Sequence, residues 1–391
     1  MNILYVVDVD IENPSFGNAQ RTRLVYDALC KIGKVYVLNT KKLRLCPQKG
    51  FKRIVNAIWQ RIVINPCGRC LVPVYPFPLR WSIEEWFPNV NFDVVVARYL
   101  YYVGSMSLWK ISRRLYVDID DYPMQVLKTV FAPNYGFLRK IVSRLVNDLF
   151  CKFVIGKLTG CWIANPDQVR LVSTRVPCIP LLNIPFSVTS SDENERQYIV
   201  HNREEYVFTV GLMSYAPNYL GVDSFLREVW PVVHSKYPDL RYKIVGRGVP
   251  AQYSEEWAKL PNVEILGYVD ELSDLYAKCI ATVVPISSGG GTCIKTLEAM
   301  LNSRICISSP FGTRGLPEAV WRDGANGVVV YRSPQDFTDV IDRIKNDERW
   351  REQSEQAAAK YIRTHYSREN FEKTVLKLIE SKDAECGHSS P

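Results

Sequence analysis

The sequence predicts an α/β protein made of two doubly wound, Rossmann-like domains. Its 391 residues are more than one hydrophobic core ordinarily serves. In both halves, short β-branched apolar runs alternate with helical patterns, which is typical of parallel sheets covered on both faces. A stretch rich in proline and polar residues, 177–197, separates the halves and is typical of a linker. We therefore expect one domain over residues 1–195 and a second over 196–365.

The first domain is expected to contain five strands and a helix over residues 19–30. The strand candidates are NILYVVDV (2–9), KVYVLN (34–39), FDVVVARY (92–99), RLYVDI (114–119) and GCWIAN (160–165). Open α/β sheets bind ligands beyond the carboxyl ends of their strands. Two such domains facing each other are therefore expected to form a central cleft between their loop edges.

The second domain repeats this alternation. Its strand candidates are EYVFTVG (205–211), LRYKIVG (240–246), NVEILGYV (262–269), IATVVPI (280–286) and RICISS (304–309). Residues after Pro334 are mainly helical in pattern. We expect residues 366–391 to form a C-terminal helix that packs back toward the first domain and ends in a frayed tail.

Cysteine usage and the N-terminus predict a cytoplasmic protein. The eleven cysteines are scattered and mostly lie in apolar stretches, as reduced, buried thiols do. The first residues lack a basic region and a cleavage site, so they do not form a signal peptide. Cys67 and Cys70 have metal-ligand spacing, but zinc needs four ligands and no second pair exists, so we interpret them as part of an ordinary loop. No nucleic-acid partner is expected.

The net charge of +8 is unevenly distributed, since no acidic residue occurs between Asp27 and Glu84. Within this basic region, residues 41–61 mix lysine and arginine with Phe51 and Trp59. Such a segment suits either a solvated basic face or peripheral contact with an anionic membrane, and both interpretations stay open. A second basic amphipathic stretch, 137–158, is expected to turn its apolar positions toward the core.

The stretch SSGGGTCIKTLEAM, residues 287–300, predicts a binding site for a phosphate group. Glycines let a backbone approach a ligand closely, and the free amides at the start of the following helix favour an anion. Lys295 adds a full positive charge, and Glu298 lies three residues later on the same face. Alternatively, the glycines only turn the chain and both charges are solvated.

At this point the sequence resembles the retaining GT-B glycosyltransferases of family 4, also called group 1. The resemblance is carried by PISSGGGTCIKTLEAMLNSRICISSPFGTRGLPE, VGLMSYAPN (210–218), IVGRG (244–248), VEILGYVDELSDLYAKC (263–279) and DGANGVVV (323–330), in the order of the family. The motif K-LEAM further resembles a GGGT subgroup of polysaccharide-type transferases. SFGNAQRTRLVYDAL near the N-terminus resembles the family's glycine-bearing first loop.

The resemblance implies a set of donor-binding residues. Glu298 would hold the nucleotide ribose, Lys295 the diphosphate, and the segment at Tyr268 and Val269 the nucleobase. The full set implied for the nucleotide sugar is Gly17, Asn18, Gly211, Asn218, Tyr268, Val269, Gly290, Gly291, Thr292, Lys295 and Glu298. Of these, Lys295 and Glu298 are expected to act in catalysis together with Asp120.

Two departures from the family pattern point to a variant site. The first glutamate of the E-x7-E motif is replaced by Gly290, and the Arg and Lys that follow the first strand of the second domain are replaced by Met213 and Asn218. Asn218 can still donate a hydrogen bond to a phosphate, which leaves Lys295 as the main cation. Whether the missing glutamate alters activity stays open.

Asp118 and Asp120 form a DxD motif, which binds metal in a different transferase fold. In GT-B enzymes basic residues and a helix dipole replace the metal, so we expect a metal-independent enzyme without a cofactor. Asp118, Asp121 and Arg98 are expected to bind the acceptor, and Arg98 suits an anionic one. Helix capping is the alternative role for Asp120 and Asp121.

The resemblance implies a hexosyltransferase that uses a nucleoside diphosphate sugar and a glycan or lipid-linked acceptor in bacterial surface polysaccharide or glycolipid assembly. Two alternatives stay open. One is a nucleotide-sugar epimerase of the same fold, which the absence of histidine before residue 201 disfavours. The other is a non-catalytic nucleotide-sugar-binding subunit.

Overall fold

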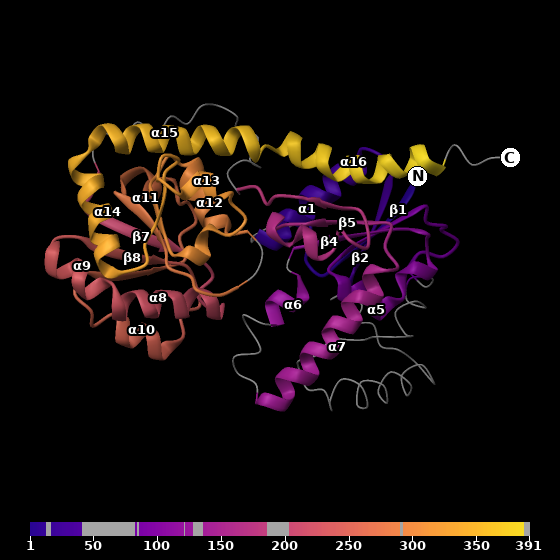
Figure 1. The fold of residues 1–391 in the computed structure, drawn as a ribbon, viewed down its shortest axis with the longest axis horizontal. Coiled ribbons are helices and arrows are strands. Elements are labelled where there is room, and N and C mark those ends of the chain that lie inside the picture. Colours follow the sequence, from indigo (N-terminus) through magenta and orange to yellow (C-terminus); the bar gives the residue numbers. More distant parts are fainter. Residues whose placement is uncertain are drawn as a thin grey trace. The chain divides into compact units, whose positions relative to one another are not determined.

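The computed structural model describes residues 1–12, 17–40, 83, 86–120, 122–127, 136–185, 203–289 and 292–386. The chain forms two compact units, Met1–Asn183 with Arg368–Pro391 and Ile184–Ser367. Each unit contains one six-stranded parallel sheet with helices on its faces (Figure 1). The predicted α/β class with two doubly wound domains is therefore confirmed. The boundary predicted near residue 195 lies outside the described residues.

The sheet of unit 1 has the order β2-β1-β3-β4-β5-β6, and all of its paired strands run parallel. Five strands were expected, and the sixth is a three-residue edge strand that ends in a proline, which is found at sheet edges. The strands are β1 (Asn2–Val7), β2 (Lys34–Asn39), β3 (Val94–Arg98), β4 (Arg114–Ile119), β5 (Gly160–Ile163) and β6 (Cys178–Pro180).

The described helices of unit 1 lie on both sides of this sheet (Figure 1). On the first face α1 (Gly17–Cys30) packs against α16 (Arg368–Cys386), which also contacts β5. On the second are α5 (Leu100–Met106), α6 (Pro123–Val126) and α7 (Phe137–Ile155). The expected helix over 19–30 is confirmed, and the C-terminal residues belong to the core of unit 1.

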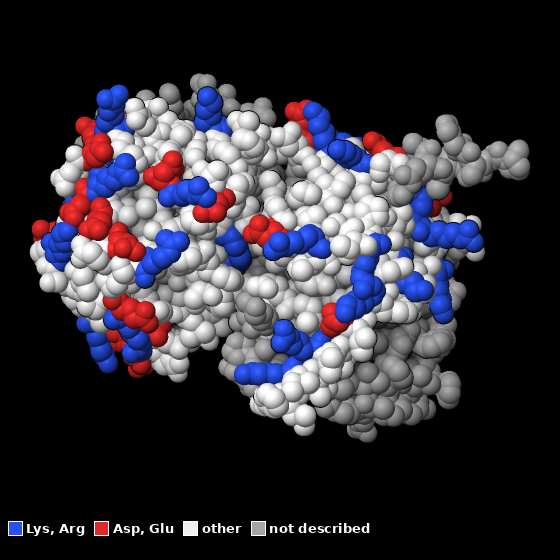
Figure 2. Space-filling view, in the orientation of Figure 1, with Lys and Arg blue, Asp and Glu red and all other residues white. Residues whose placement is uncertain are grey.

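The orientation predicted for α7 is wrong. Its large apolar side chains were expected to face the core, yet most of them are exposed, and the surface along α7 in Figure 2 is largely uncharged. The positions that α7 buries include Ser143, Asn147 and Cys151. These side chains are small or polar, so they let the helix approach α5 and α6 closely.

The sheet of unit 2 has the order β12-β11-β10-β7-β8-β9, again with parallel pairing. All five expected strands are present, and the short edge strand β12 is additional. The strands are β7 (Tyr206–Val210), β8 (Arg241–Val245), β9 (Val263–Gly267), β10 (Ala281–Val284), β11 (Cys306–Ser308) and β12 (Val328–Val330).

The helices of unit 2 form two layers over this sheet (Figure 1). One layer contains α8 (Ala216–Glu228), α9 (Trp230–Lys236), α10 (Ala251–Trp257) and α14 (Pro334–Asn346). The other contains α11 (Ser273–Lys278), α12 (Ile294–Leu301), α13 (Glu318–Trp321) and α15 (Glu348–His365). The helical character expected after Pro334 is confirmed by α14, α15 and α16.

Four charged side chains and Asn183 form a closed network of ion pairs and hydrogen bonds at the carboxyl edge of the unit 1 sheet, which we call the charge ring. Asp118, at the end of β4, accepts hydrogen bonds from Arg21 of α1 (2.6 Å from Nη2) and from Arg98 of β3. Arg98 also binds Asp120 at 3.1 Å. Asn183 closes the ring, since it accepts from Arg21 at 2.7 Å and donates to Asp120 at 3.4 Å. Two positive and two negative charges thus compensate one another.

Burial makes this ring sensitive to the loss of any charge. The side chains of Arg98 and Asp118 are fully buried, and that of Arg21 is 2% exposed. Burial alone would raise the pKa of Asp118, but the two guanidinium groups lower it by more, so its pKa lies below the ordinary value. Without the Asp118 charge, two arginines would be left under-compensated in a poorly solvated site.

We expect the Asp118→Asn substitution to lower the free energy of unfolding by about 3–5 kcal/mol at neutral pH, the usual cost of breaking a buried ion pair. Asp118 stabilises the fold above its unfolded pKa of about 3.9, and this contribution disappears as pH falls through its lower folded pKa. The difference between wild type and variant should therefore shrink in acid. Urea unfolding followed by circular dichroism at several pH values measures it.

Asp120→Asn is the matched control. Its side chain is 16% exposed and pairs with one arginine, so we expect a smaller loss of stability. Equal losses in both variants, or a difference that does not change between neutral and acidic pH, would contradict the role given to Asp118.

Candidate functional site

The order of the strands in unit 2 places a ligand site between β7 and β10. These strands are neighbours, but the chain proceeds from β7 to β8 on one side and from β10 to β11 on the other. Such a reversal is a topological switch point, where loops leave in opposite directions and open a crevice at the carboxyl ends of the strands. The loop after β7 begins at Gly211, and the loop after β10 leads into α12.

Gly211, Lys295 and Asn218 come together at this switch point. A Cβ atom placed on Gly211 would lie 2.7 Å from Cε of Lys295 and 3.0 Å from Nδ2 of Asn218, so a larger residue here would require the lysine side chain to shift. Asn218, in the first turn of α8, donates from Nδ2 to the carbonyl of Leu212 at 2.7 Å. The structure thus brings together three of the residues predicted to bind the donor.

Lys295 carries a charge that the described protein compensates poorly. Among the described residues, no hydrogen bond or ion pair to its ammonium group is found. Burial lowers its pKa below the ordinary lysine value, Arg314 lowers it further, and Cys293 acts in the opposite direction. The N-cap residue of α12, Cys293, also makes no side-chain bond to the first turn. This turn can therefore offer both amides and a cation to an anion.

Arg314 is a second cation of the site, and sequence reasoning missed it. It follows the short 3₁₀ turn Pro310–Thr313, and its guanidinium lies over the ring of Phe311 at 4.2 Å. A Cβ on Gly289, the first glycine of the GGGT sequence, would lie 3.3 Å from its Nη2. The only signal in the sequence was its position in FGTRGLPE, inside the stretch that carries the family resemblance.

The start of α12 packs directly against the loop that carries Arg314. Thr296 donates to the carbonyl of Gly312 at 2.7 Å. Gly315, with a positive φ of 86°, leaves room for Thr292, because a Cβ at position 315 would lie 2.6 Å from the threonine hydroxyl. Thr292 is itself buried. The start of α12 and the loop bearing Arg314 therefore form one packed element.

Glu298 lies one turn after Lys295 and is 8% exposed. The pKa of Tyr276 is raised, first by burial and then by the negative charge of Glu298, so the carboxylate lies near this buried tyrosine. Both side chains belong to the same layer of unit 2. The ribose-binding role of Glu298 stays a prediction.

Tyr268 and Val269 follow β9, beyond the end of β8. Tyr268 is 64% exposed, and the guanidinium of Arg247 lies 5.5 Å from its ring centre. Backbone bonds connect this edge to the switch point: Gly246 donates to Gly267 at 2.7 Å, and Gly211 donates to Val245 at 3.0 Å. An exposed aromatic ring backed by a cation suits stacking with a flat ligand.

In unit 1 the structure gives Arg98 and Asp118 a different environment from the expected one. Both were predicted to contact an acceptor, but their side chains are fully buried in the charge ring, so neither offers an exposed atom to a ligand. Asp120 is partly exposed and is oriented by Arg98. Arg21, which completes the ring, was not singled out from the sequence.

Several predicted residues lie outside the part of the chain that can be described. These are Asp121, Gly290, Gly291 and the segment 41–61, and at the start of α1 also the surroundings of Gly17 and the side chain of Asn18. The Cys67 and Cys70 pair lies outside it as well. Their predicted roles stay predictions.

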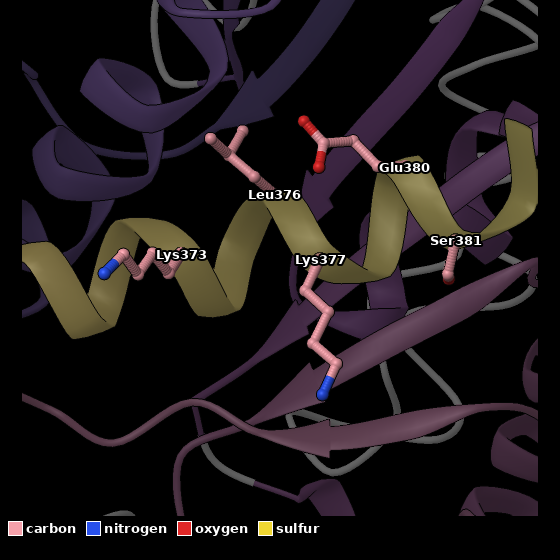
Figure 3. A pocket seen from close by; sticks show the side chains of 5 residues that line it. All are labelled: Lys373, Leu376, Lys377, Glu380 and Ser381. Atoms are coloured by element: carbon pink, nitrogen blue, oxygen red, sulfur yellow. The ribbon is translucent and has the colours of Figure 1, made fainter.

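A hollow of about 450 Å³ occurs on α16 in unit 1, but its described lining comes from that single helix. Figure 3 shows that the lining side chains leave the helix on different sides, and Lys373 is already paired with Glu369 at 2.6 Å. The hollow therefore lacks the converging polar groups of a ligand site. Within the described ranges, no group of three or more His, Cys, Asp or Glu is placed to hold a metal ion.

Comparison with known proteins agrees with this placement of the site. Residues 204–347 match the family model described as "Glycosyl transferases group 1", which spans the switch point and both cations. None of the curated proteins compared with the chain matches it significantly. The narrower GGGT subgroup stays a prediction.

Solved structures resemble the chain in fold. TarM from S. aureus, as a mutant in complex with Fondaparinux, alpha-GlcNAc-glycerol and UDP, is 16% identical with a TM-score of 0.56, over 77% of this chain and 58% of TarM. This chain thus spans less than three fifths of TarM. Sucrose-phosphate synthase from Thermosynechococcus elongatus is 13% identical with a TM-score of 0.66, over 98% and 100%. HepE from Anabaena, in complex with UDP and glucose, is 12% identical with a TM-score of 0.59, over 99% of both chains.

At these identities the structural likenesses show the fold alone. They agree with the parallel sheets of the two units. The chain therefore has the GT-B fold, and residues 204–347 match the group 1 glycosyltransferase model.

Proposed function

We propose that the protein is a retaining glycosyltransferase that moves a hexose-type sugar from a uridine diphosphate sugar to an acceptor hydroxyl. The observation that carries the proposal is the pair of cations at the switch point. Lys295 is desolvated and lies within the field of Arg314, an arrangement that is unfavourable until an anion binds. Uridine is proposed because TarM and HepE are complexed with UDP.

The same groups suit the chemistry of transfer. As the glycosidic bond breaks, negative charge grows on the leaving diphosphate, and fixed donors aimed at that charge lower the barrier. Lys295, Arg314 and the first amides of α12 are such donors, and Asn218 adds a neutral one. We propose that these cations fill the role that a metal ion has in other transferases, so treatment with EDTA should leave the rate unchanged.

On the acceptor side, Asp120 is the described unit 1 residue best suited to contact a hydroxyl. Its carboxylate is partly exposed, and Arg98 and Asn183 fix it in place. We further propose a glycan or lipid-linked acceptor in surface polysaccharide or glycolipid assembly, and a cytoplasmic location with peripheral membrane contact.

We expect Lys295→Ala and Glu298→Ala each to lower kcat/KM at least about tenfold, a loss of roughly 1.4 kcal/mol or more of transition-state stabilisation. The Lys295 variant removes charge next to the diphosphate, and the Glu298 variant removes the contact to the ribose. Release of UDP in the presence of acceptor measures the rate. Lys278→Ala on α11 is the control, since this exposed lysine lies in the same unit and makes the same charge change.

Wild-type rates in both variants would contradict the site. Binding of UDP-sugar without acceptor-dependent release of UDP would instead indicate a binding subunit. A donor sugar whose configuration changes without transfer would indicate an epimerase. The anomeric configuration of the product, determined by NMR, tests retention.

The lowered pKa of Lys295 predicts how nucleotide binding depends on pH. In the free protein its ammonium group loses a proton at a lower pH than an ordinary lysine does, whereas bound diphosphate favours the charged form. Affinity for UDP should therefore fall as pH rises through the lowered pKa. The terminal phosphate itself titrates near about pH 6, well below this range.

Isothermal titration calorimetry with UDP between neutral and alkaline pH measures this dependence. Lys295→Arg is the matched variant, because arginine stays charged throughout and should retain affinity at alkaline pH. An identical alkaline loss in wild type and Lys295→Arg would assign the titration to another group.

A further inference from the structure

Helix α7 exposes an unusually large apolar surface. Eight large apolar side chains of this one helix are between 40% and 81% exposed: Phe137, Leu138, Ile141, Val142, Leu145, Val146, Leu149 and Phe153. Single exposed apolar residues are normal in proteins, but a contiguous patch of this kind marks an interaction surface. At 100° per residue, the eight positions cover one half of the helix.

Helix α7 places polar as well as apolar residues on its packed face. Ser143 and Asn147 are buried together with Cys151, Val154 and Ile155, and Asn147 donates to the carbonyl of Ser143 at 2.8 Å. Its amide is therefore satisfied within the helix. The opposite half, which is apolar, is exposed, whereas an ordinary surface helix turns its apolar stripe inward.

The charges on α7 indicate the chemistry of a partner that would cover its apolar half. Between residues 137 and 158 the chain has five basic residues and one acidic residue, Asp148, which pairs with Lys152 at 2.5 Å. Lys140 and Arg144 follow the apolar half along one border. In Figure 2, basic side chains lie beside the uncharged surface of this helix. The combination of an apolar half and basic borders is typical of a helix that lies in the plane of an anionic membrane surface.

Two other arrangements fit less well. A second copy of the chain would bring the same net positive surface against this one, and like charges disfavour such a contact. Insertion across a bilayer also does not suit α7, which has five charged residues among its 19. No helix in the described ranges is long and apolar enough to cross a membrane.

We propose that α7 is a membrane-docking helix, which lies flat on anionic lipid with its eight apolar side chains in the boundary between headgroups and acyl chains. This surface consists of described residues of unit 1, and the basic segment 41–61 of the sequence is not part of the proposal. The inference concerns lipid binding alone, so it stands independently of the transfer reaction.

Flotation with vesicles tests the docking helix. We expect the wild-type protein to float with vesicles of phosphatidylcholine containing phosphatidylserine and to float much less with phosphatidylcholine alone. The triple variant Leu138→Gln, Leu145→Gln, Leu149→Gln should reduce the bound fraction at least about tenfold. These leucines are exposed, so the fold should be retained, and circular dichroism and UDP binding by calorimetry verify it.

Two matched variants complete the test. Leu171→Gln, Leu220→Gln, Leu266→Gln changes three exposed leucines elsewhere, which are 40% to 50% exposed, and should float like wild type. Lys140→Glu with Arg144→Glu should abolish the preference for anionic vesicles.

Three results would overturn the proposal. The wild-type protein could remain unbound at low salt. The α7 leucine variant could float as well as wild type, which would place membrane contact elsewhere. Alternatively, the wild-type protein could be a dimer without lipid and the α7 leucine variant a monomer, which would make this face a protein interface.

Discussion

The site of unit 2 depends on one constraint, the pairing of β7 with β10 in a sheet whose chain leaves these strands in opposite directions. This pairing brings the loop after β7 against α12, which follows β10. The approach is close, since a Cβ on Gly211 would lie 2.7 Å from Cε of Lys295 and would displace that side chain. Gly221 allows a second close approach, between α8 and the segment after β10, since a Cβ there would lie 2.7 Å from the carbonyl oxygen of Pro285. Glycine at both positions lets α8 and α12 converge on the carboxyl edge of the sheet.

Buried charges are paired with opposite charges in unit 1, whereas the cations of unit 2 repel each other. In unit 1, two arginines and two aspartates neutralise one another within a closed ring. Such a ring orients Asp120 but has little remaining attraction for a ligand. In unit 2, burial and the positive charge of Arg314 both disfavour the charged form of Lys295. A bound diphosphate would favour that charged form. This difference supports the proposal that the negatively charged donor binds to unit 2 and that Asp120 contacts a neutral hydroxyl.

The sequence was sufficient for the strands because short β-branched runs between helical patterns have few other structural solutions. It could not show which strands pair, since order depends on packing between distant segments. Arg314 was missed because nothing local distinguishes it among 49 Lys and Arg. The burial of Arg98 and Asp118 depends on Arg21, which lies 97 positions before Asp118. For α7, periodicity identified the apolar half correctly but not the direction it faces, because small residues such as Ser143 and Cys151 also make a good packing surface.

The glycine at position 290 can be interpreted through the positive charges of Lys295 and Arg314. The family resemblance implies a glutamate there, and Gly290 lies directly after Gly289, whose Cβ position is 3.3 Å from Arg314. The family's glutamate would add one negative charge to the sequence next to Gly289, and so lower the net positive charge of a loop that is proposed to bind an anion. Its absence keeps that charge available for the diphosphate, in a site where Asn218 has replaced a basic residue. The two departures from the family pattern then offset each other only in part, since one removes a single negative charge and the other removes the positive charges of an arginine and a lysine.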